Sequence, residues 1–127
     1  MHINRKKTFF IPLILSAIFL LSGCGGNAGY PVISGDAKLI FFFGNTCPHC
    51  KIVEEYFEKN KVAEKIEFEQ AEVYTVKANA EILKQKAEVC GVSLAELGVP
   101  MLWNDGKCLV GDRDIISYFE GRLKNNE

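Results

Sequence analysis

Residues 39–50 read LIFFFGNTCPHC and join a continuous apolar run to two closely spaced cysteines. The run Leu39–Phe43 has strand length, and an unbroken apolar strand is typical of a sheet covered on both faces. The polar residues Gly44–Thr46 end this strand, and Pro48 is well suited to the first turn of a helix. We therefore predict a strand-to-helix junction, with both cysteines at the beginning of the helix.

Apolar spacing predicts the elements that follow this junction. The first helix is expected to turn four side chains inward: Ile52, Val53, Tyr56 and Phe57. Residues Lys65–Glu69 alternate between polar and apolar, which predicts a second strand that can extend to Val73. A second helix is predicted over residues 77–89, and the spacing of its apolar residues places Cys90 on the buried stripe.

A hairpin and a last helix complete the predicted fold. Asn104-Asp105-Gly106 separates two strand-like segments, residues 99–103 and 107–110, and is a strong hairpin signal. Asp112 is expected to cap a helix that buries Ile115, Ile116, Phe119 and Leu123. The order strand, helix, strand, helix, strand, strand, helix predicts an α/β fold. Its mixed four-stranded sheet would carry helices on both faces, with the first two strands parallel and the last two antiparallel.

The N-terminal residues indicate export. Arg5, Lys6 and Lys7 precede 13 almost wholly apolar residues, Phe9–Leu21. This run is shorter than the ~20 residues of a membrane-spanning helix and fits the apolar region of a secretory signal. Leu21-Ser22-Gly23-Cys24 resembles the lipobox of bacterial lipoproteins, in which the cysteine becomes the lipidated N-terminus. The alternatives are an ordinary signal peptide with an incidental cysteine and a retained transmembrane anchor.

Three segments are therefore predicted: a lipoprotein signal peptide over residues 1–23, a tether over 24–36 and one small domain over 37–127. The tether is glycine-rich and can include a short strand at 30–33. Outside the cytosol, disulfides become possible, and a lipid anchor with more than one acyl chain gives stable membrane attachment. Without the signal, 12 basic and 16 acidic residues remain, so nucleic acid is a poor candidate partner.

The paired cysteines belong to a wider pattern. An apolar strand leads into CPHC at a helix start, and Gly98-Val99-Pro100 follows about fifty residues later, before a strand and a hairpin. Together these features resemble the thioredoxin superfamily over about residues 37–124. CPHC itself is similar to DsbA-type disulfide oxidases, whereas the short N-terminus and the final segment are closer to glutaredoxins in size.

The resemblance implies a thioredoxin-like fold and thiol–disulfide exchange, with Cys47 attacking the substrate and Cys50 resolving the mixed disulfide. It also implies that Pro100 is a cis-proline and that the backbone of Val99 pairs with an extended substrate peptide. The alternative for Pro100 is a trans proline that opens an edge strand.

The motif contains residues suited to stabilising a thiolate at Cys47. The helix N-terminus favours an anion, Pro48 favours an extended backbone at the preceding residue, and His49 can supply a donor or a positive charge. A stabilised thiolate makes the corresponding disulfide a stronger oxidant. The alternatives for the pair are a static staple and half of a zinc site, and His49 can be an inert exposed residue.

The sequence also departs from the superfamily pattern. Phe41 occupies the position of a buried carboxylate that normally accepts a proton from the second cysteine, so water or a carboxylate elsewhere would have to replace it. Thr46 stands where thioredoxins have a tryptophan. Residues 110–114 resemble part of a glutaredoxin glutathione site, but Val110 replaces one glycine and nearby aspartates oppose a carboxylate, so helix capping is the favoured interpretation.

These residues lead to one main hypothesis and one rival. The main hypothesis is a lipid-anchored, extracytoplasmic thiol–disulfide oxidoreductase that acts on exported proteins, needs no cofactor or metal, and is recharged by a redox partner. The rival is a copper(I)-handling or adaptor module on the same fold, which would bind copper(I) through the cysteine pair with Met101 as a further ligand. A non-catalytic structural domain is the remaining possibility. The remaining cysteines, Cys90 and Cys108, are either a second disulfide or two buried thiols.

Overall fold

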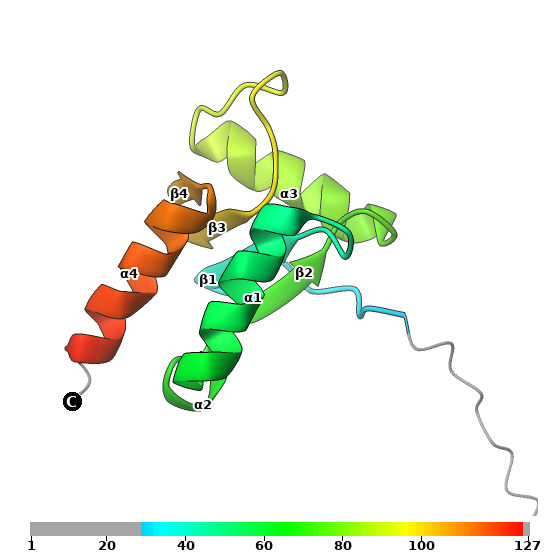
Figure 1. Ribbon diagram of the computed structural model, residues 1–127. Coiled ribbons are helices and arrows are strands. Elements are labelled where there is room, and N and C mark those ends of the chain that lie inside the picture. Colours follow the sequence, from blue (N-terminus) through cyan, green and yellow to red (C-terminus); the bar gives the residue numbers. More distant parts are fainter. Residues whose placement is uncertain (1–28, 126–127) are drawn as a thin grey trace, which may run out of the picture.

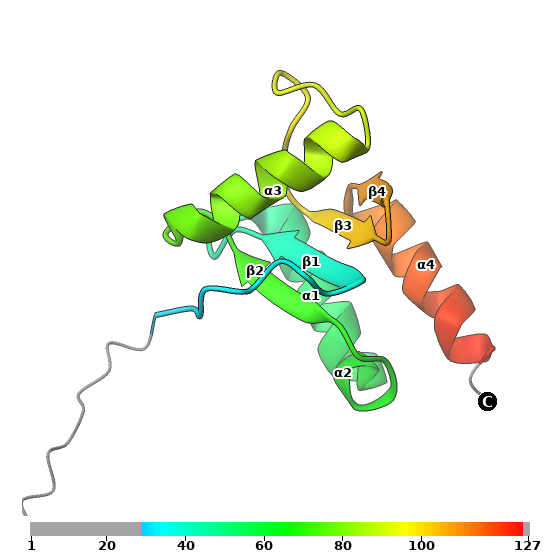
Figure 2. The same ribbon diagram turned by 180° about the vertical axis from the view of Figure 1, so that it is seen from behind.

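The computed structural model describes residues 29–125. Its elements are β1 (Leu39–Phe43), α1 (Pro48–Asn60), α2 (Val62–Lys65), β2 (Glu69–Glu72), α3 (Lys77–Val89), β3 (Met101–Asn104), β4 (Lys107–Val110) and α4 (Asp112–Lys124). The strands form one sheet in the order β2-β1-β3-β4. Helices α1 and α4 cover one face of the sheet (Figure 1) and α3 covers the other (Figure 2). The predicted mixed four-stranded sheet with helices on both faces is confirmed, with α2 as an addition.

Strand β1 is the centre of the core. It pairs in parallel with β2 and antiparallel with β3, and all five of its residues are buried. Its side chains alternate: Phe41 packs on the α1 and α4 side, whereas Ile40 and Phe42 pack on the α3 side. This two-sided burial explains why the strand is apolar without interruption. Each such side chain contributes ~1.5–3 kcal/mol when it is fully removed from water.

An aromatic cluster joins α1 and α4 to this strand. The ring centroid of Phe57 lies 5.1 Å from that of Phe41 and 4.7 Å from that of Phe119, both in edge-on geometry. Phe68 contacts Phe57 and Phe119 from the segment before β2. These contacts fix α1 over the sheet and thereby fix the position of the cysteine pair at its beginning.

The second strand begins later than predicted. Residues 62–65 form the short helix α2, and the strand covers Glu69–Glu72 instead of starting at Lys65. The reason is that Val62 and Ile66 are both buried at a helical spacing of four, and the amide of Ile66 donates to the carbonyl of Val62. The predicted extension to Val73 is supported, because its amide donates to the carbonyl of Phe43.

Two further predictions about helices are wrong. Ile52 was expected on the inner face of α1 but is 46% exposed, because the buried stripe follows Cys50, Val53 and Phe57. Asp112 was expected to cap the last helix, but the cap position is Gly111 and Asp112 is the first helical residue. Gly111 has a φ of +96°, which side-chain-bearing residues rarely adopt, so the chain can turn sharply from β4 into α4.

The segment before β1 is attached to the domain, although no strand forms at residues 30–33. The buried side chain of Asn79 in α3 accepts from the amide of Ile33 and donates to the carbonyl of Pro31. The ring of Tyr30 packs edge-on against Phe43. Cys24 and the predicted signal peptide lie outside the described residues. Among residues 29–125, no helix has the length and apolar character needed to cross a membrane.

Candidate functional site

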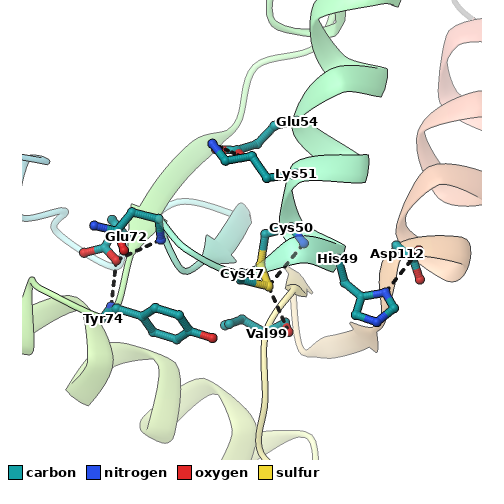
Figure 3. The surroundings of a disulfide bond; sticks show 10 residues. Cys47, His49, Cys50, Lys51, Glu54, Glu72, Tyr74, Val99 and Asp112 are labelled. Carbon is teal, nitrogen blue, oxygen red and sulfur yellow. Dashed lines mark hydrogen bonds and ion pairs between the residues drawn. A yellow bond between two sulfur atoms is a disulfide. The ribbon is translucent and has the colours of Figure 1, made fainter.

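Cys47 and Cys50 form a disulfide at the junction of β1 and α1 (Figure 3). Cys47 is the N-cap residue of α1, and its extended backbone, with a φ of −83° and a ψ of 115°, agrees with the restriction that Pro48 imposes. The amide of Cys50 donates to the sulfur of Cys47 at 3.2 Å. One of the otherwise unpartnered N–H groups of the helix N-terminus therefore points at this sulfur.

The electrostatics of this position favour a thiolate at Cys47 after reduction. The helix dipole and the Cys50 amide both stabilise negative charge there, and the first turn of α1 contains no acidic residue. The two cysteines differ in exposure, because Cys47 retains 5% of its surface and Cys50 retains none. An incoming sulfur can therefore reach Cys47, whereas Cys50 lies beneath it.

The Val99–Pro100 segment lies against the beginnings of both α1 and α4. The Val99–Pro100 peptide bond is cis. The carbonyl oxygen of Val99 lies 3.6 Å from the sulfur of Cys47, and the carbonyl of Pro100 accepts from the amide of Gly111. The structure thus brings together three features that are distant in the sequence: the cysteine pair, the proline segment and the beginning of the last helix.

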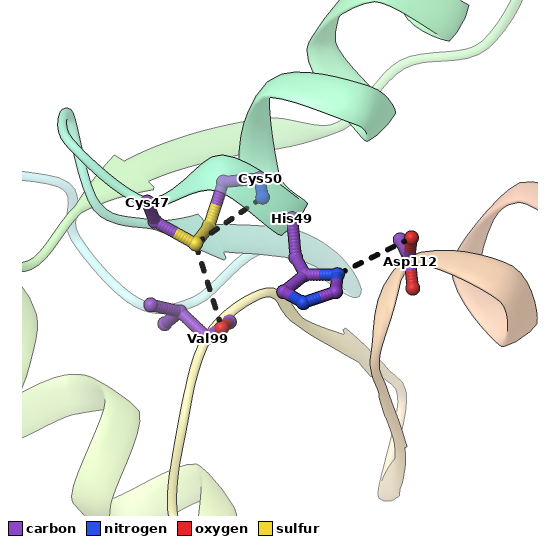
Figure 4. A network of polar contacts seen from close by, with 5 residues as sticks. All are labelled: Cys47, His49, Cys50, Val99 and Asp112. Atoms are coloured by element: carbon purple, nitrogen blue, oxygen red, sulfur yellow. Dashed lines mark hydrogen bonds and ion pairs between the residues drawn. A yellow bond between two sulfur atoms is a disulfide. The ribbon is translucent and has the colours of Figure 1, made fainter.

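His49 turns toward α4 (Figure 4). Its Nδ1 lies 3.4 Å from Oδ2 of Asp112, and the His49 side chain is 68% exposed whereas that of Asp112 is 23% exposed. Partial burial alone would raise the pKa of Asp112, but the hydrogen bond from His49 and backbone N–H groups outweigh it and lower the pKa of this carboxyl. The residue expected to assist Cys47 is therefore engaged by a carboxylate of another helix.

Sequence reasoning missed Glu72, a fully buried carboxylate at the end of β2. It accepts from the amides of Asn45, Tyr74, Thr75 and Val76, and from the hydroxyl of Thr75. Burial would raise the pKa of Glu72, but these hydrogen bonds, led by those from Thr75, lower it. A carboxylate so fully paired is an anchor for the loop before Cys47 and is poorly suited to accept a proton from Cys50.

No direct signal for this role is present in the sequence. The cap position of α3 is Val76, whose side chain cannot accept a hydrogen bond, and Glu72 instead accepts from the amides of Tyr74, Thr75 and Val76, which precede the helix. The position expected to hold a carboxylate, Phe41, is apolar and fully buried, as the sequence implies.

Tyr74 and Gly44 form the rim of the site on the side away from His49. A side-chain carbon at Gly44 would overlap the ring of Tyr74, so glycine at this position lets the ring lie against the loop before Cys47. The Tyr74 ring is 54% exposed and lies near Val99 and Cys47 (Figure 3). An open hollow of about 320 Å³ adjoins it, lined mainly by apolar side chains that include Leu83, Leu97 and Val99.

The other two cysteines of the described residues also form a disulfide. Cys90 and Cys108 have Cα atoms 5.8 Å apart and connect the end of α3 to β4. Met101 lies on this side of the sheet, in the cluster that α3 covers, whereas Cys47 and Cys50 belong to the opposite cluster. Met101 is therefore not a further ligand for the Cys47–Cys50 pair. Within residues 29–125 no group of three or more potential metal-binding His, Cys, Asp or Glu side chains is found.

Comparison with solved structures shows the fold class. A wheat glutaredoxin matches with 26% identity and a TM-score of 0.50, over 72% of this chain and 80% of that one. Oxidised glutaredoxin 2 from Chlamydomonas reinhardtii matches with 19% identity, a TM-score of 0.47, and coverage of 70% and 78%. A buckwheat glutaredoxin–glutathione complex matches with 17% identity, a TM-score of 0.48, and coverage of 70% and 74%.

No protein-family model matches the chain. No curated protein matches it either. The fold is thioredoxin-like, as the sequence predicted. Of the three matches, the similarity to the wheat glutaredoxin is the one on which this assignment rests. Together with the position of Cys47 and Cys50 at the beginning of α1, this likeness supports a thiol–disulfide redox function.

Proposed function

We propose that this chain is a lipid-anchored thiol–disulfide oxidoreductase that exchanges disulfides with exported proteins outside the cytoplasm. The observation that carries the redox part is the sulfur of Cys47 at the N-cap of α1, where it accepts a hydrogen bond from the amide of Cys50. A sulfur that is stabilised as an anion is both a good attacking group and a good leaving group in disulfide exchange.

The proposed oxidation has two steps. A thiolate of the reduced substrate attacks the sulfur of Cys47, the Cys47–Cys50 bond breaks, and Cys50 leaves as a thiolate that takes up a proton. A second substrate thiolate then attacks the substrate sulfur of the mixed disulfide and releases Cys47 as a thiolate. The substrate gains a disulfide, two electrons pass to the cysteine pair, and a partner disulfide must reoxidise it. Reduction of a substrate follows the same steps in reverse.

Protein substrates fit this site better than glutathione. The first turn of α4 carries Asp112 and Asp114, which would oppose a ligand carboxylate at this helix N-terminus. The hollow beside Tyr74 and Val99 offers an apolar wall on the other side of the cysteine pair, which suits the apolar side chains of an unfolded polypeptide. The CPHC motif favours the direction in which the protein oxidises its substrate.

Trapping tests the redox proposal. Full-chain protein with Cys50→Ala cannot resolve the mixed disulfide, so it should accumulate a covalent adduct with a peptide disulfide, visible as a mass increase that a reductant removes. The matched control is Cys47→Ala, which leaves the buried cysteine alone and should form far less adduct. Equal trapping by the two variants, or none by either, would refute the role of Cys47. Stoichiometric copper(I) retention without exchange would instead support the metal-binding rival.

The anchor is tested separately. The apolar run Phe9–Leu21 followed by Leu21-Ser22-Gly23-Cys24 supports lipidation at Cys24. Bacteria that express the chain should incorporate labelled palmitate into the wild type but not into Cys24→Ser, and the variant should lose its attachment to the membrane fraction. Equal labelling of the two proteins would contradict the anchor without affecting the redox proposal.

A further inference from the structure

His49 is the second residue of α1, but its polar contact is with a different helix. Among the contacts of the described residues, the sulfur of Cys47 meets the amide of Cys50 and the carbonyl of Val99. The imidazole instead extends from α1 to the first residue of α4, with Nδ1 at 3.4 Å from Oδ2 of Asp112. Figure 4 shows the ring leaning toward Asp112, on the far side from the sulfur.

The charges around this contact are few. The first turn of α1 has no acidic side chain, and the first turn of α4 has Asp112 and Asp114, with Arg113 between them. Of the two acids, Asp112 is the one that contacts His49, whereas Asp114 is exposed. The side chain of Asp112 is largely covered, so its charge is screened less than that of a fully exposed acid.

We propose that Asp112 is a positioning residue that makes the Cys47–Cys50 pair less oxidising by holding the imidazole of His49 against α4 and away from the sulfur of Cys47. This inference rests on the proposed function, because a reduction potential matters only if the pair exchanges disulfides. It adds a residue that the cysteine motif does not contain and assigns to α4 a role in setting the chemistry of α1.

The direction follows from the reduction step. The disulfide takes up two electrons and two protons to give two thiols, and ionisation of Cys47 then stabilises the reduced form. Asp112 opposes this ionisation in two ways, because it draws the imidazole away from the sulfur and adds a negative charge near the mouth of α1. Removing the carboxylate should therefore favour the thiolate and make the disulfide easier to reduce.

The test is the Asp112→Asn variant in the full chain, equilibrated with reduced and oxidised glutathione at pH 6. We expect the equilibrium constant for disulfide formation to fall by about three- to tenfold, tenfold being ~30 mV for a two-electron couple. The pH at which Cys47 becomes reactive to iodoacetamide should fall as well.

Asp114→Asn is the matched control, because it removes the same charge from the same turn without touching His49. It should leave both readouts close to wild type. In a His49→Ala background, Asp112→Asn should lose most of its effect, and this loss separates positioning from a direct charge effect. Circular dichroism establishes that the variants fold, and Asp112→Ser provides a second replacement if Asp112→Asn does not.

Three outcomes would overturn the inference: no shift in Asp112→Asn, an equal shift in Asp114→Asn, or a full shift without His49. Failure of the proposed function gives a different pattern. In that case Cys50→Ala protein would trap no mixed disulfide with a peptide disulfide, while the alkylation of Cys47 would still report whether Asp112 acts through His49.

Discussion

The two disulfides of this domain have the same bond but different surroundings. Cys47 and Cys50 are three residues apart at the mouth of α1, with one sulfur next to a helix amide and a backbone carbonyl. Cys90 and Cys108 are 18 residues apart and connect the end of α3 to β4. The first bond closes a very small loop. The second connects α3 and β4, which precede and follow the segment containing Pro100 in the chain.

The difference separates reactivity from restraint. A short loop at a helix N-terminus reduces the entropy of the unfolded chain only slightly, but it places a sulfur where an anion is stabilised. A longer loop restrains the unfolded chain more, and no helix N-terminus lies at either of its cysteines. We therefore expect the first pair to carry the chemistry and the second pair to carry stability.

The largest expected effect is on exchange. Replacing Cys47 with serine should lower the rate of disulfide exchange with a peptide substrate by about a thousandfold or more, because a hydroxyl does not replace the thiolate in this chemistry. Replacing Cys90 and Cys108 together with alanine should leave that rate within about twofold, since neither cysteine touches the site. If both variants lost a comparable fraction of the exchange rate, the two disulfides would not differ in reactivity.

The next effect is on stability. Loss of the Cys90–Cys108 bond should lower the free energy of unfolding by about 3 kcal/mol, as the chain-entropy relation gives for a loop of this size. Loss of the Cys47–Cys50 bond in a Cys47→Ala, Cys50→Ala protein should cost at least about 1 kcal/mol less. Urea denaturation of the two oxidised double variants beside wild type measures both values. Equal losses would mean that the two bonds do not differ in restraint.

The sequence predicted the parts of this comparison that depend on local pattern. Unbroken apolar character identified β1, and the proline in CPHC identified the beginning of α1, because both signals lie within a few residues. The α2 turn was missed because Lys65–Glu69 alternates as a strand does, while the burial of Val62 and Ile66 depends on packing against distant elements. Local alternation cannot reveal which of two periods the tertiary structure uses.

The same distinction between local sequence pattern and tertiary packing applies to the residues of the candidate site. The cysteine pair and the Val99–Pro100 segment were predicted from motifs, whereas Glu72 and the His49–Asp112 contact were not. The His49–Asp112 contact and the bond from Asn45 to Glu72 join residues that are far apart in the chain, so they depend on how α1 packs beside α4 and how β1 pairs with β2. The other Glu72 bonds are local, but no motif in the sequence identifies them. The family resemblance showed that the usual buried carboxylate is replaced by Phe41. It did not indicate that Glu72 would be a buried carboxylate elsewhere in the domain.

Glu72 provides the third prediction, which concerns the loop before Cys47. Glu72→Gln should lower the free energy of unfolding by about 2 kcal/mol at pH 7, because an amide cannot accept all the hydrogen bonds that the carboxylate takes. Since folding lowers the pKa of Glu72, its contribution is fully present above the ordinary value of ~4.3 and is lost as pH falls through the lowered value.

The difference between wild type and Glu72→Gln should therefore be constant near neutral pH and shrink below about pH 4. Glu67→Gln is the matched control, since Glu67 is exposed and precedes the same strand. Denaturation at a series of pH values measures the difference directly. A gap that widens on acidification would contradict the assignment of Glu72 as a buried carboxylate that is stabilised in its charged form.

The smallest expected effect lies beside the second disulfide. Lys86 is one turn before Cys90, and its Nζ lies 4.5 Å from the ring centroid of Trp103, whose strand neighbour across the β3–β4 pair is Cys108. Lys86→Gln should lower the free energy of unfolding by about 0.5–1 kcal/mol through loss of this cation–π contact, and Lys86→Arg should preserve it. Trp103 is the only tryptophan of the chain, so its fluorescence reports the unfolding.

The disulfide holds Lys86 and Trp103 in register, and the effect of Lys86→Gln should therefore shrink when Cys90 and Cys108 are alanines. An undiminished effect in that background would show that the second bond does not organise this end of α3.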